Sequence, residues 1–418
     1  MLCEDPESLA NAAYFDHAAI TPLRPEALEA MCTLASDIGN PSSAHSVGRR
    51  ARCHLEEARE SIADNLGARP SEVIFVSSGT EADNLALKGM ALQRAGQECH
   101  RLLLSAVEHH SVSDTAKWLS DYRHHYFGID LDILPVDAEG RVLPDVVAER
   151  LNQDDVPLLL TVMAANNETG TVQPITELAD LALSHDVPFH VDAVQAATHI
   201  PVDFSHPGIT TMSVASQKIG GPTGVGVLLA RRDAPLIPLF HGGGQERGLR
   251  PGTQNLLGIV GMAAALRSAI AQQHEETVRL VALRKRLIDG LHAAVDDVII
   301  NGPEEATCGA DTPVLPGIVS ATFPGCEGDA LLMLLDGKDV SVSLGAACSA
   351  GVAQASEVLL AMGIPAQQAR GTLRLSMGYT TTEEHIDTLL HALPQVVERA
   401  RFCLLYTSDA ADEGLGVD

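Results

Sequence analysis

The sequence predicts an α/β protein, with a large domain built on a mostly parallel sheet and a smaller α+β domain after it. Two observations lead to this class. Short apolar runs rich in β-branched residues alternate with helical patterns as far as residue 255, which is typical of βαβ units. After that point the pattern changes to long helices with scattered strands. A chain of 418 residues is long enough for two or three domains.

The elements of the large domain follow from their length and composition. Helices are predicted between the strands at 49–66, 81–95 and 175–185, and Gly96 occupies the usual C-terminal position of the second. Six short runs are predicted to be buried strands: 73–78, 101–107, 158–164, 187–191, 210–214 and 224–230.

The second domain begins with two predicted long helices, at about 256–272 and 275–295. Strands are predicted near 298–301, 317–323, 339–344 and 372–377, with helices at 329–335, 356–362 and 382–402. No repeat or low-complexity linker separates the two halves. We therefore expect a large domain at 13–255 and a smaller one at 256–402 that pack on each other.

Residues 403–418 read CLLYTSDAADEGLGVD, where the apolar periodicity stops and all four charges are acidic. One interpretation is a disordered acidic tail. A sharper one is that residues 403–413 translate the mosaic end and adapter used in transposase-based library preparation. We expect this tail to be sequencing-derived and not native structure, and leave it out of the fold.

Composition excludes several classes of function. The net charge is −27, with no local basic patch, which argues against nucleic-acid binding. No apolar stretch approaches 18 residues, and residues 1–6 lack a signal-peptide pattern, so a cytoplasmic protein without membrane contact is expected. The eight cysteines include no CxxC pair, so neither a structural metal nor a disulfide framework is expected.

The first candidate binding feature is an apolar strand that runs into Ser78, Gly79 and Thr80 and then into a helix. Thr80 is a suitable N-cap, and the Gly79 amide could approach a phosphate closely. The alternative is a plain strand-turn-helix cap, which is the more common case for such a turn by itself.

Asp192 and Lys218 form the second feature. Asp192 ends a predicted strand, where α/β sheets bind ligands. Lys218 follows another strand and precedes a glycine-rich turn. An aspartate beside a pyridinium nitrogen and a lysine that forms a Schiff base are what pyridoxal phosphate chemistry requires. Each residue alone is more often at the surface, but together with the phosphate seat they favour this cofactor.

The third feature is Cys348 in the loop GAACSAG at 345–351. Small neighbours and a following helix N-terminus favour an exposed, reactive thiolate. An inert buried thiol is an equally good interpretation of the loop alone.

These motifs resemble those of the cysteine desulfurases, fold-type I pyridoxal phosphate enzymes of the class V aminotransferase superfamily, over residues 13–402. The matching segments are 14–22 (YFDHAAITP), 39–45 (GNPSSAH), 78–84 (SGTEADN), 166–170 (NNETG), 242–253 (GGGQERGLRPGT) and the cysteine loop. The loop and residues 356–363 are similar to the subgroup with the longer cysteine loop, which serves iron–sulfur cluster assembly and tRNA thiolation. The resemblance also implies a seven-stranded sheet in the large domain.

The resemblance implies a role for each matching residue. Lys218 would bind the cofactor covalently, Asp192 would pair with the pyridinium nitrogen, and Cys348 would take the sulfur. Arg374 would hold the substrate carboxylate as a bidentate fork. The other cofactor ligands would be His109 stacked on the ring, Asn167 and Gln195 at the ring hydroxyl, Gly79 and Thr80 at the phosphate, and Thr253 donated to the phosphate by the other subunit of a homodimer.

The sequence departs from the family pattern beside the lysine. The family usually has a serine three residues and a histidine one residue before it, and both contact the phosphate. Here Ala215 and Gln217 occupy those positions. Gln217 can still donate a hydrogen bond, alanine cannot, and Ser216 is a candidate to compensate.

The expected function is conversion of L-cysteine to L-alanine, with the sulfur left as a persulfide on Cys348 for transfer to an acceptor protein. Two alternatives stay open. One is another class V aminotransferase or a selenocysteine lyase. The other is a non-catalytic scaffold in a sulfur-transfer assembly.

Overall fold

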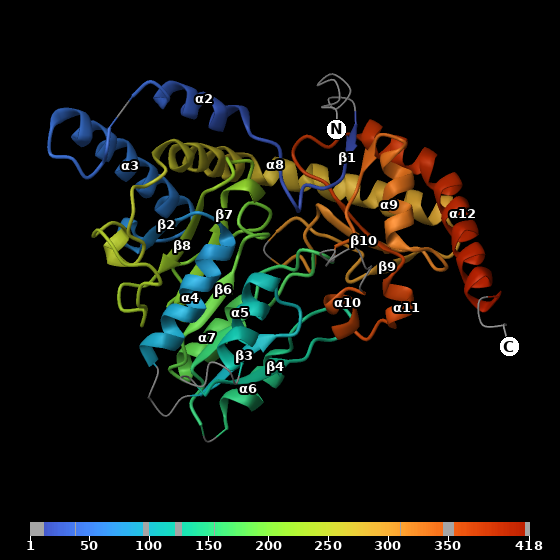
Figure 1. Ribbon diagram of the computed structural model, residues 1–418, viewed down its shortest axis with the longest axis horizontal. Helices are drawn as coiled ribbons and strands as arrows, with labels where there is room; N and C mark the ends of the chain where they lie inside the picture. The colour runs from blue at the N-terminus through green and yellow to red at the C-terminus, as the bar shows by residue number, and fades with distance from the viewer. Residues whose placement is uncertain are drawn as a thin grey trace.

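The fold is that of a computed structural model. It describes residues 12–413 except 38, 95–99, 122–127, 154, 310 and 346–354, with side chains as far as Phe402. Two bodies lie side by side: the large domain with helices α2 to α7, and the small domain with helices α9 to α12 (Figure 1). Gly96 and Cys348 lie outside the described residues.

The large domain is built on a seven-stranded sheet, and the predicted fold class is confirmed. Its strand order is β2-β8-β7-β6-β5-β3-β4. All neighbours are parallel except those of β8, which is antiparallel to both β2 and β7. The strands are β2 (Val73–Val76), β3 (Arg101–Ser105), β4 (Asp130–Leu134), β5 (Leu159–Thr161), β6 (Phe189–Asp192), β7 (Thr211–Ala215) and β8 (Gly226–Ala230).

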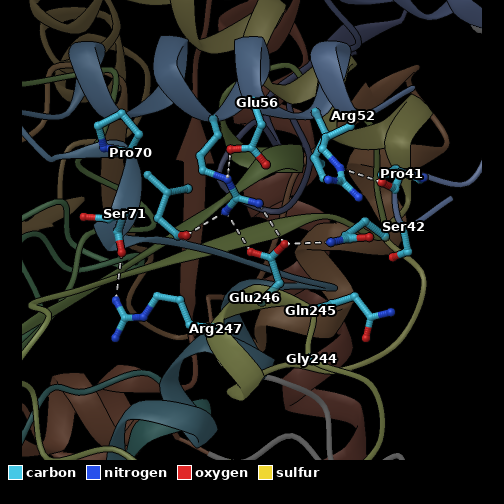
Figure 2. Close-up of a pocket in the computed structure, with 14 residues that line it drawn as sticks. Pro41, Ser42, Arg52, Glu56, Pro70, Ser71, Gly244, Gln245, Glu246 and Arg247 are labelled. Carbon is cyan, nitrogen blue, oxygen red and sulfur yellow. Dashed lines mark hydrogen bonds and ion pairs between the residues drawn. The ribbon is translucent and has the colours of Figure 1, made fainter. Parts of the chain in front are cut away.

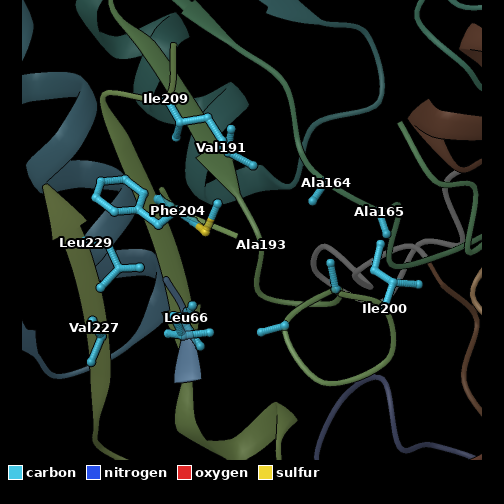
Figure 3. Close-up of a cluster of buried hydrophobic side chains, with 14 of the residues drawn as sticks. Leu66, Ala164, Ala165, Val191, Ala193, Ile200, Phe204, Ile209, Val227 and Leu229 are labelled. Atoms are coloured by element: carbon cyan, nitrogen blue, oxygen red, sulfur yellow. The ribbon is translucent and has the colours of Figure 1, made fainter. Parts of the chain in front are cut away.

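Helices cover both faces of this sheet because successive strand residues point to opposite sides. Val73 and Phe75 pack on one face with helices α3 (Ser46–Asn65), α6 (Pro144–Leu151) and α7 (Ile175–Ser184). Ile74 and Val76 pack on the other with α4 (Gly79–Arg94) and α5 (His110–Ser120). Figure 3 shows part of the first cluster, with Phe204 and Leu229 among its buried side chains.

The small domain contains an antiparallel sheet of order β12-β10-β9, formed by β9 (Ile299–Asn301), β10 (Ile318–Thr322) and β12 (Thr372–Ser376). A second, parallel pair joins β1 (Ala13–Tyr14) to β11 (Val340–Ser341). The N-terminal strand therefore packs in the small-domain core, although the sequence led us to place residue 13 in the large domain. The helices of this domain are α9 (Gly328–Asp336), α10 (Glu357–Ala361), α11 (Ala366–Ala369) and α12 (Glu383–Glu413).

One continuous helix, α8 (Leu256–Ala294), crosses from the large domain to the small one (Figure 1). The prediction of two separate helices was wrong, because neither glycine nor proline interrupts residues 262–289. Its first half packs in the large-domain core through Ile259 and Leu266, and its second half in the small-domain core through Leu283 and Leu287. By length and composition α8 could cross a membrane, but half of its most apolar window is buried inside the protein, as in a core helix.

Two further expectations differ from the structure. Strand β4 was missed because it lies at the sheet edge, is only partly buried and has charged Asp130 and Asp132 among its five residues, so it lacks the apolar run that identified the other strands. The helix predicted at 382–402 is longer in the structure, because the backbone of 403–413 continues α12; the sequencing-derived origin of the tail stays a prediction. No glycine or proline interrupts the chain there before Gly414.

Helix α2 (Pro25–Leu34) lies against α8.

Candidate active site

The parallel strands bring most of the predicted site residues to one edge of the sheet, as expected for ligand sites in open α/β sheets. His109 follows β3, Asn167 follows β5, Asp192 ends β6 and Lys218 follows β7. All four line one cavity of about 800 Å³. Arg374 of the small domain lines the same cavity, which therefore lies between the two domains.

Lys218 ends a short 3-10 turn, Ser216–Lys218, directly after β7. Its Nζ donates to the carbonyl oxygens of Ala18 at 2.6 Å and Ala19 at 2.7 Å. Burial and, to a lesser extent, the Arg374 charge lower the pKa of Lys218 to about 8. The neutral fraction of this amine near physiological pH is therefore far larger than that of an ordinary lysine, and the neutral amine can act as a nucleophile.

Asp192 is buried at the carboxyl end of β6. Its Oδ1 accepts from the Val194 amide at 2.9 Å and from the Ser213 hydroxyl at 3.4 Å. Burial, and then the nearby Asp83 carboxylate, raise the pKa of Asp192. A cation placed in the cavity next to this carboxyl would favour its ionised form.

His109 is the N-cap of α5, and its ring is fixed by a polar chain. Its Nδ1 accepts from the Ser111 amide at 3.1 Å and lies 2.7 Å from the Ser111 hydroxyl. That hydroxyl donates to Asp83 at 2.6 Å, and Asp83 lies 3.2 Å from His190 Nε2. Burial lowers the pKa of His109, so its ring is predominantly neutral.

The predicted phosphate seat lies at the start of α4, and Gly79 and Thr80 both line the cavity. A Cβ at Gly79 would lie 2.8 Å from Val194 Cγ2, so a larger residue would have to displace the Val194 side chain. The N-cap differs from the prediction, because the Ser78 hydroxyl, and not Thr80, accepts from the Glu81 amide at 3.1 Å. Thr80 is exposed at the mouth of the cavity and free of that role.

Arg374 on β12 is the guanidinium of the site. One nitrogen donates to Asp16 Oδ1 at 2.9 Å, and another donates to the Asn167 carbonyl at 3.1 Å. Its Nε is buried and has no hydrogen-bond partner within the described part of the chain. A planar fork with a free donor is suited to binding a carboxylate.

The remaining predicted ligands fall into two groups. Gln195 lines the cavity and donates to the Ala18 carbonyl at 2.9 Å, and Ala215 and Gln217 line it too. Ser216 does not, because it is fully buried with its hydroxyl against Gly221. It is therefore not placed to replace the serine that the family has at position 215.

Thr253 is exposed, and none of the described residues that line this cavity comes from 242–255. Cys348 lies outside the described residues. The chain on either side of its segment does reach the cavity, through Gly345 and Ala355.

Sequence reasoning gave no role to two buried carboxyl groups at this site. Asp83 holds the His109–Ser111 chain. Glu108 lines the cavity, accepts from the Met163 amide at 2.8 Å through Oε1, and has no partner for its buried Oε2 among the described residues. Burial, and then the Asp192 and Asp83 charges, raise its pKa well above the usual range. Its position next to His109 was the only signal in the sequence.

The donor set fits pyridoxal 5′-phosphate. A lysine with a lowered pKa, a buried carboxyl and a helix N-terminus that requires glycine open on one cavity. Lys218 would bind the aldehyde carbon, Asp192 the ring nitrogen, and Gly79 and Thr80 the phosphate. No group of metal-ligating side chains occurs among the described residues.

The sequence profile of the class-V aminotransferases matches residues 13–389. The chain belongs to the class-V aminotransferase family. Enzymes of this family depend on pyridoxal phosphate, in agreement with the geometry of the cavity.

Curated relatives and solved structures agree with this assignment. An IscS-like cysteine desulfurase of Mycobacterium tuberculosis is 49% identical over 96% of this chain and 100% of its own length. The cysteine desulfurase IscS of Dictyoglomus turgidum is 40% identical over 94% of this chain and 96% of its own. A solved NifS-like protein superposes with a TM-score of 0.83 at 35% identity, over 94% of this chain and 100% of its own. A structure described as SspA in complex with cysteine superposes with a TM-score of 0.72 at 34% identity, over 88% of this chain and 99% of its own length.

Proposed function

We propose that this class-V aminotransferase is a cysteine desulfurase that converts L-cysteine to L-alanine and keeps the sulfur as a persulfide on Cys348. One observation carries the proposal. The segment that holds Cys348 leaves and rejoins the described chain, at Gly345 and Ala355, on the same cavity as Lys218 and Arg374. The names of the relatives, which are cysteine desulfurases at up to 49% identity, support it.

Each residue contributes a separate part of the chemistry. Arg374 binds the substrate carboxylate through its free Nε and directs the amino acid toward Lys218. Lys218 would hold the cofactor and, as a free amine once substrate is bound, would accept the Cα proton. Pyridoxal phosphate, when bound, supplies the electron sink for the bond-breaking steps, and Asp192 stabilises the positive charge on its ring nitrogen.

Sulfur transfer uses Cys348. Its thiolate attacks the substrate sulfur, the new S–S bond forms, and the electron pair of the broken C–S bond remains on the three-carbon skeleton. Protonation of that skeleton gives alanine. The balance is one enzyme thiol and one cysteine in, and one persulfide and one alanine out.

We further propose a homodimer in which Thr253 contacts the cofactor phosphate of the other subunit. Thr253 is exposed, and its loop is separate from the described lining of its own Lys218 cavity. The persulfide sulfur would pass to an acceptor protein of iron–sulfur cluster assembly or tRNA thiolation. A cytoplasmic location is proposed from the charge and cysteine pattern.

The test is product analysis with Cys348→Ser. The variant should retain bound cofactor, since Lys218 and Asp192 are unchanged, but release almost no alanine from L-cysteine. A serine hydroxyl is barely ionised near neutral pH and cannot store sulfur as a persulfide. Cys53→Ser, which removes an exposed thiol on α3, should keep full turnover.

Full alanine production by Cys348→Ser would remove the thiolate from the mechanism and favour a lyase. Formation of a keto acid would favour an aminotransferase. Wild-type protein that retains no cofactor would favour a non-catalytic scaffold.

A further inference from the structure

The loop at 242–253 lines a second cavity of about 690 Å³, on the side of the large domain formed by α3 and the turn before β2 (Figure 2). Gln245, Glu246 and Arg247 border this cavity, together with Pro41 and Ser42 from the chain before α3. The loop continues through Thr253 into α8. The fixed part of the loop is Glu246, and the part exposed for contact is Thr253.

The Glu246 side chain is buried, and its carboxylate is fully hydrogen-bonded. Its side chain is 1% exposed, and each carboxylate oxygen accepts two hydrogen bonds. Arg59 of α3 donates to both oxygens, at 2.8 and 2.9 Å, and stacks on the Phe75 ring. The remaining two donors are the Phe75 amide and the Gln254 side chain, both at 3.0 Å.

The backbone at this point adopts a conformation that needs such support. Glu246 and Arg247 have φ of 47° and 60°, in the left-handed region that side chains other than glycine rarely occupy. Residues of this kind persist where the surrounding contacts determine them. The Arg59–Glu246 pair and the Arg247 bond to the Ser71 carbonyl, at 2.9 Å, supply those contacts (Figure 2).

The fixed part of the loop is connected directly to Thr253 on both sides. Gln254, the next residue, donates to Glu246. Gly252, the preceding residue, donates its amide to the Gln245 side chain at 3.0 Å. A displacement of Glu246 would therefore move Thr253.

We propose that Glu246, held by Arg59, is a positioning residue for the cofactor site of the other subunit. It fixes the loop so that Thr253 is presented to that subunit's phosphate seat. This inference rests on the homodimer of the proposed function and names the residues through which one chain serves the site of the other.

The first experiment measures the pyridoxal phosphate dissociation constant of dimeric holoenzyme variants by equilibrium dialysis. Glu246→Gln and the milder Gln254→Ala should raise it, the former by roughly tenfold, as expected for loss of a hydrogen bond between charged groups. Glu56→Gln is the matched control. Glu56 contacts the same Arg59 at 3.1 Å but lies on α3 itself and is half exposed, so it should change the constant by less than about twofold.

The second experiment separates positioning across subunits from loss of structure. Chains carrying Lys218→Ala and chains carrying Glu246→Gln, with different affinity tags, are co-expressed and the mixed dimer is isolated. Its single intact Lys218 belongs to the Glu246→Gln chain but is served by the wild-type loop of the other chain. Borohydride fixation should therefore show that this chain retains cofactor as the wild type does.

Each outcome decides the proposal. Weak cofactor retention by the Glu246→Gln chain in the mixed dimer would place the effect within one subunit and overturn it. Unchanged dissociation constants in both Glu246→Gln and Gln254→Ala would also overturn it, as would a wild-type monomer that binds cofactor tightly. The proposed function can fail separately. If the Glu246→Gln chain retains cofactor in the mixed dimer but the wild-type protein forms no alanine from L-cysteine, the positioning role is upheld and the desulfurase activity is rejected.

Discussion

The buried polar clusters around Glu246 and around Lys218 differ in how fully their polar atoms are hydrogen-bonded. Around Glu246, both carboxylate oxygens accept two hydrogen bonds and the charge is neutralised by Arg59. Around Lys218, Arg374 Nε and Glu108 Oε2 are buried without a partner in the described structure, and Lys218 meets carbonyl oxygens instead of a carboxylate.

The difference distinguishes a structural cluster from a binding cluster. Buried polar groups are normally paired, and each unpaired one costs free energy unless a ligand completes it. The Glu246 carboxylate is fully paired within one chain, although the buried Oε1 of its neighbour Gln254 has no partner among the described residues, so Glu246 and Arg59 should support folding. Polar atoms of the Lys218 cluster lack partners that a ligand could supply. Substitutions there should therefore change ligand binding more than folding stability.

The largest effect that tests this contrast is expected for Lys218→Ala. Turnover should fall by roughly 10⁴-fold or more, because the residue both attaches the cofactor and transfers the proton. Alanine release from L-cysteine measures it. The melting temperature of the cofactor-free protein should not fall, since a buried amine with few partners is removed. Lys285→Ala on the exposed face of α8 serves as control, and a comparable loss of activity there would break the contrast.

Arg59→Met should instead reduce stability. It leaves the Glu246 carboxylate buried without its cation, which typically costs about 3 kcal/mol or more. Urea unfolding of the cofactor-free protein measures this. Arg50→Met is the matched control, because the Arg50–Asp37 pair is exposed and should shift the urea midpoint little. Equal midpoints for the two variants would mean that the Glu246 cluster is not structural.

Arg374→Lys tests whether the Lys218 cluster binds the substrate carboxylate. An ammonium cannot reproduce the bidentate fork, so KM for L-cysteine should rise by about 10- to 100-fold. The absorbance of the bound cofactor should not change. Arg370→Lys, four residues earlier and exposed, should leave KM unaltered. A normal KM in Arg374→Lys would assign the substrate carboxylate to another group.

The smallest effect concerns Glu108 and pH. Burial and the charges of Asp192 and Asp83 raise its pKa in the folded state, so the unfolded chain ionises first as pH rises. The stabilising contribution is complete below about pH 4.3 and is lost as the pH rises through the folded-state pKa, by about 1.4 kcal/mol for each unit that separates the two pKa values.

Glu108→Gln removes this dependence. The variant of the cofactor-free protein should gain melting temperature relative to wild type between pH 5 and pH 8, as followed by circular dichroism. Glu357→Gln, an exposed carboxyl at the rim of the cavity, should follow the wild-type curve. A constant difference across pH would show that Glu108 ionises at its ordinary pKa.

The sequence was sufficient to predict the strands that carry the site, because each is a short apolar run with β-branched residues. It also located Lys218 and Asp192, whose chemistry is specific to one cofactor. The parallel topology then brought His109, Asn167, Asp192 and Lys218 to one cavity.

What the sequence did not contain was information on long-range packing. The pairing of β1 with β11 joins residues more than 300 positions apart, which no local pattern encodes. The Ser216 hydroxyl is directed to Gly221 by the tight turn after β7, and the partners of Glu246 come from α3, β2 and the chain just before α8. Both depend on tertiary contacts.

The 39-residue length of α8 has a mechanical consequence. At 1.5 Å per residue it is a rod of about 58 Å, fixed at one end among the α2 and α3 helices and at the other in the core behind β10 and β12. The small domain carries Arg374, so any rotation that moves this residue toward Lys218 must bend the rod or turn it as a whole. The separation between the two residues is thereby set by the stiffness of a single helix.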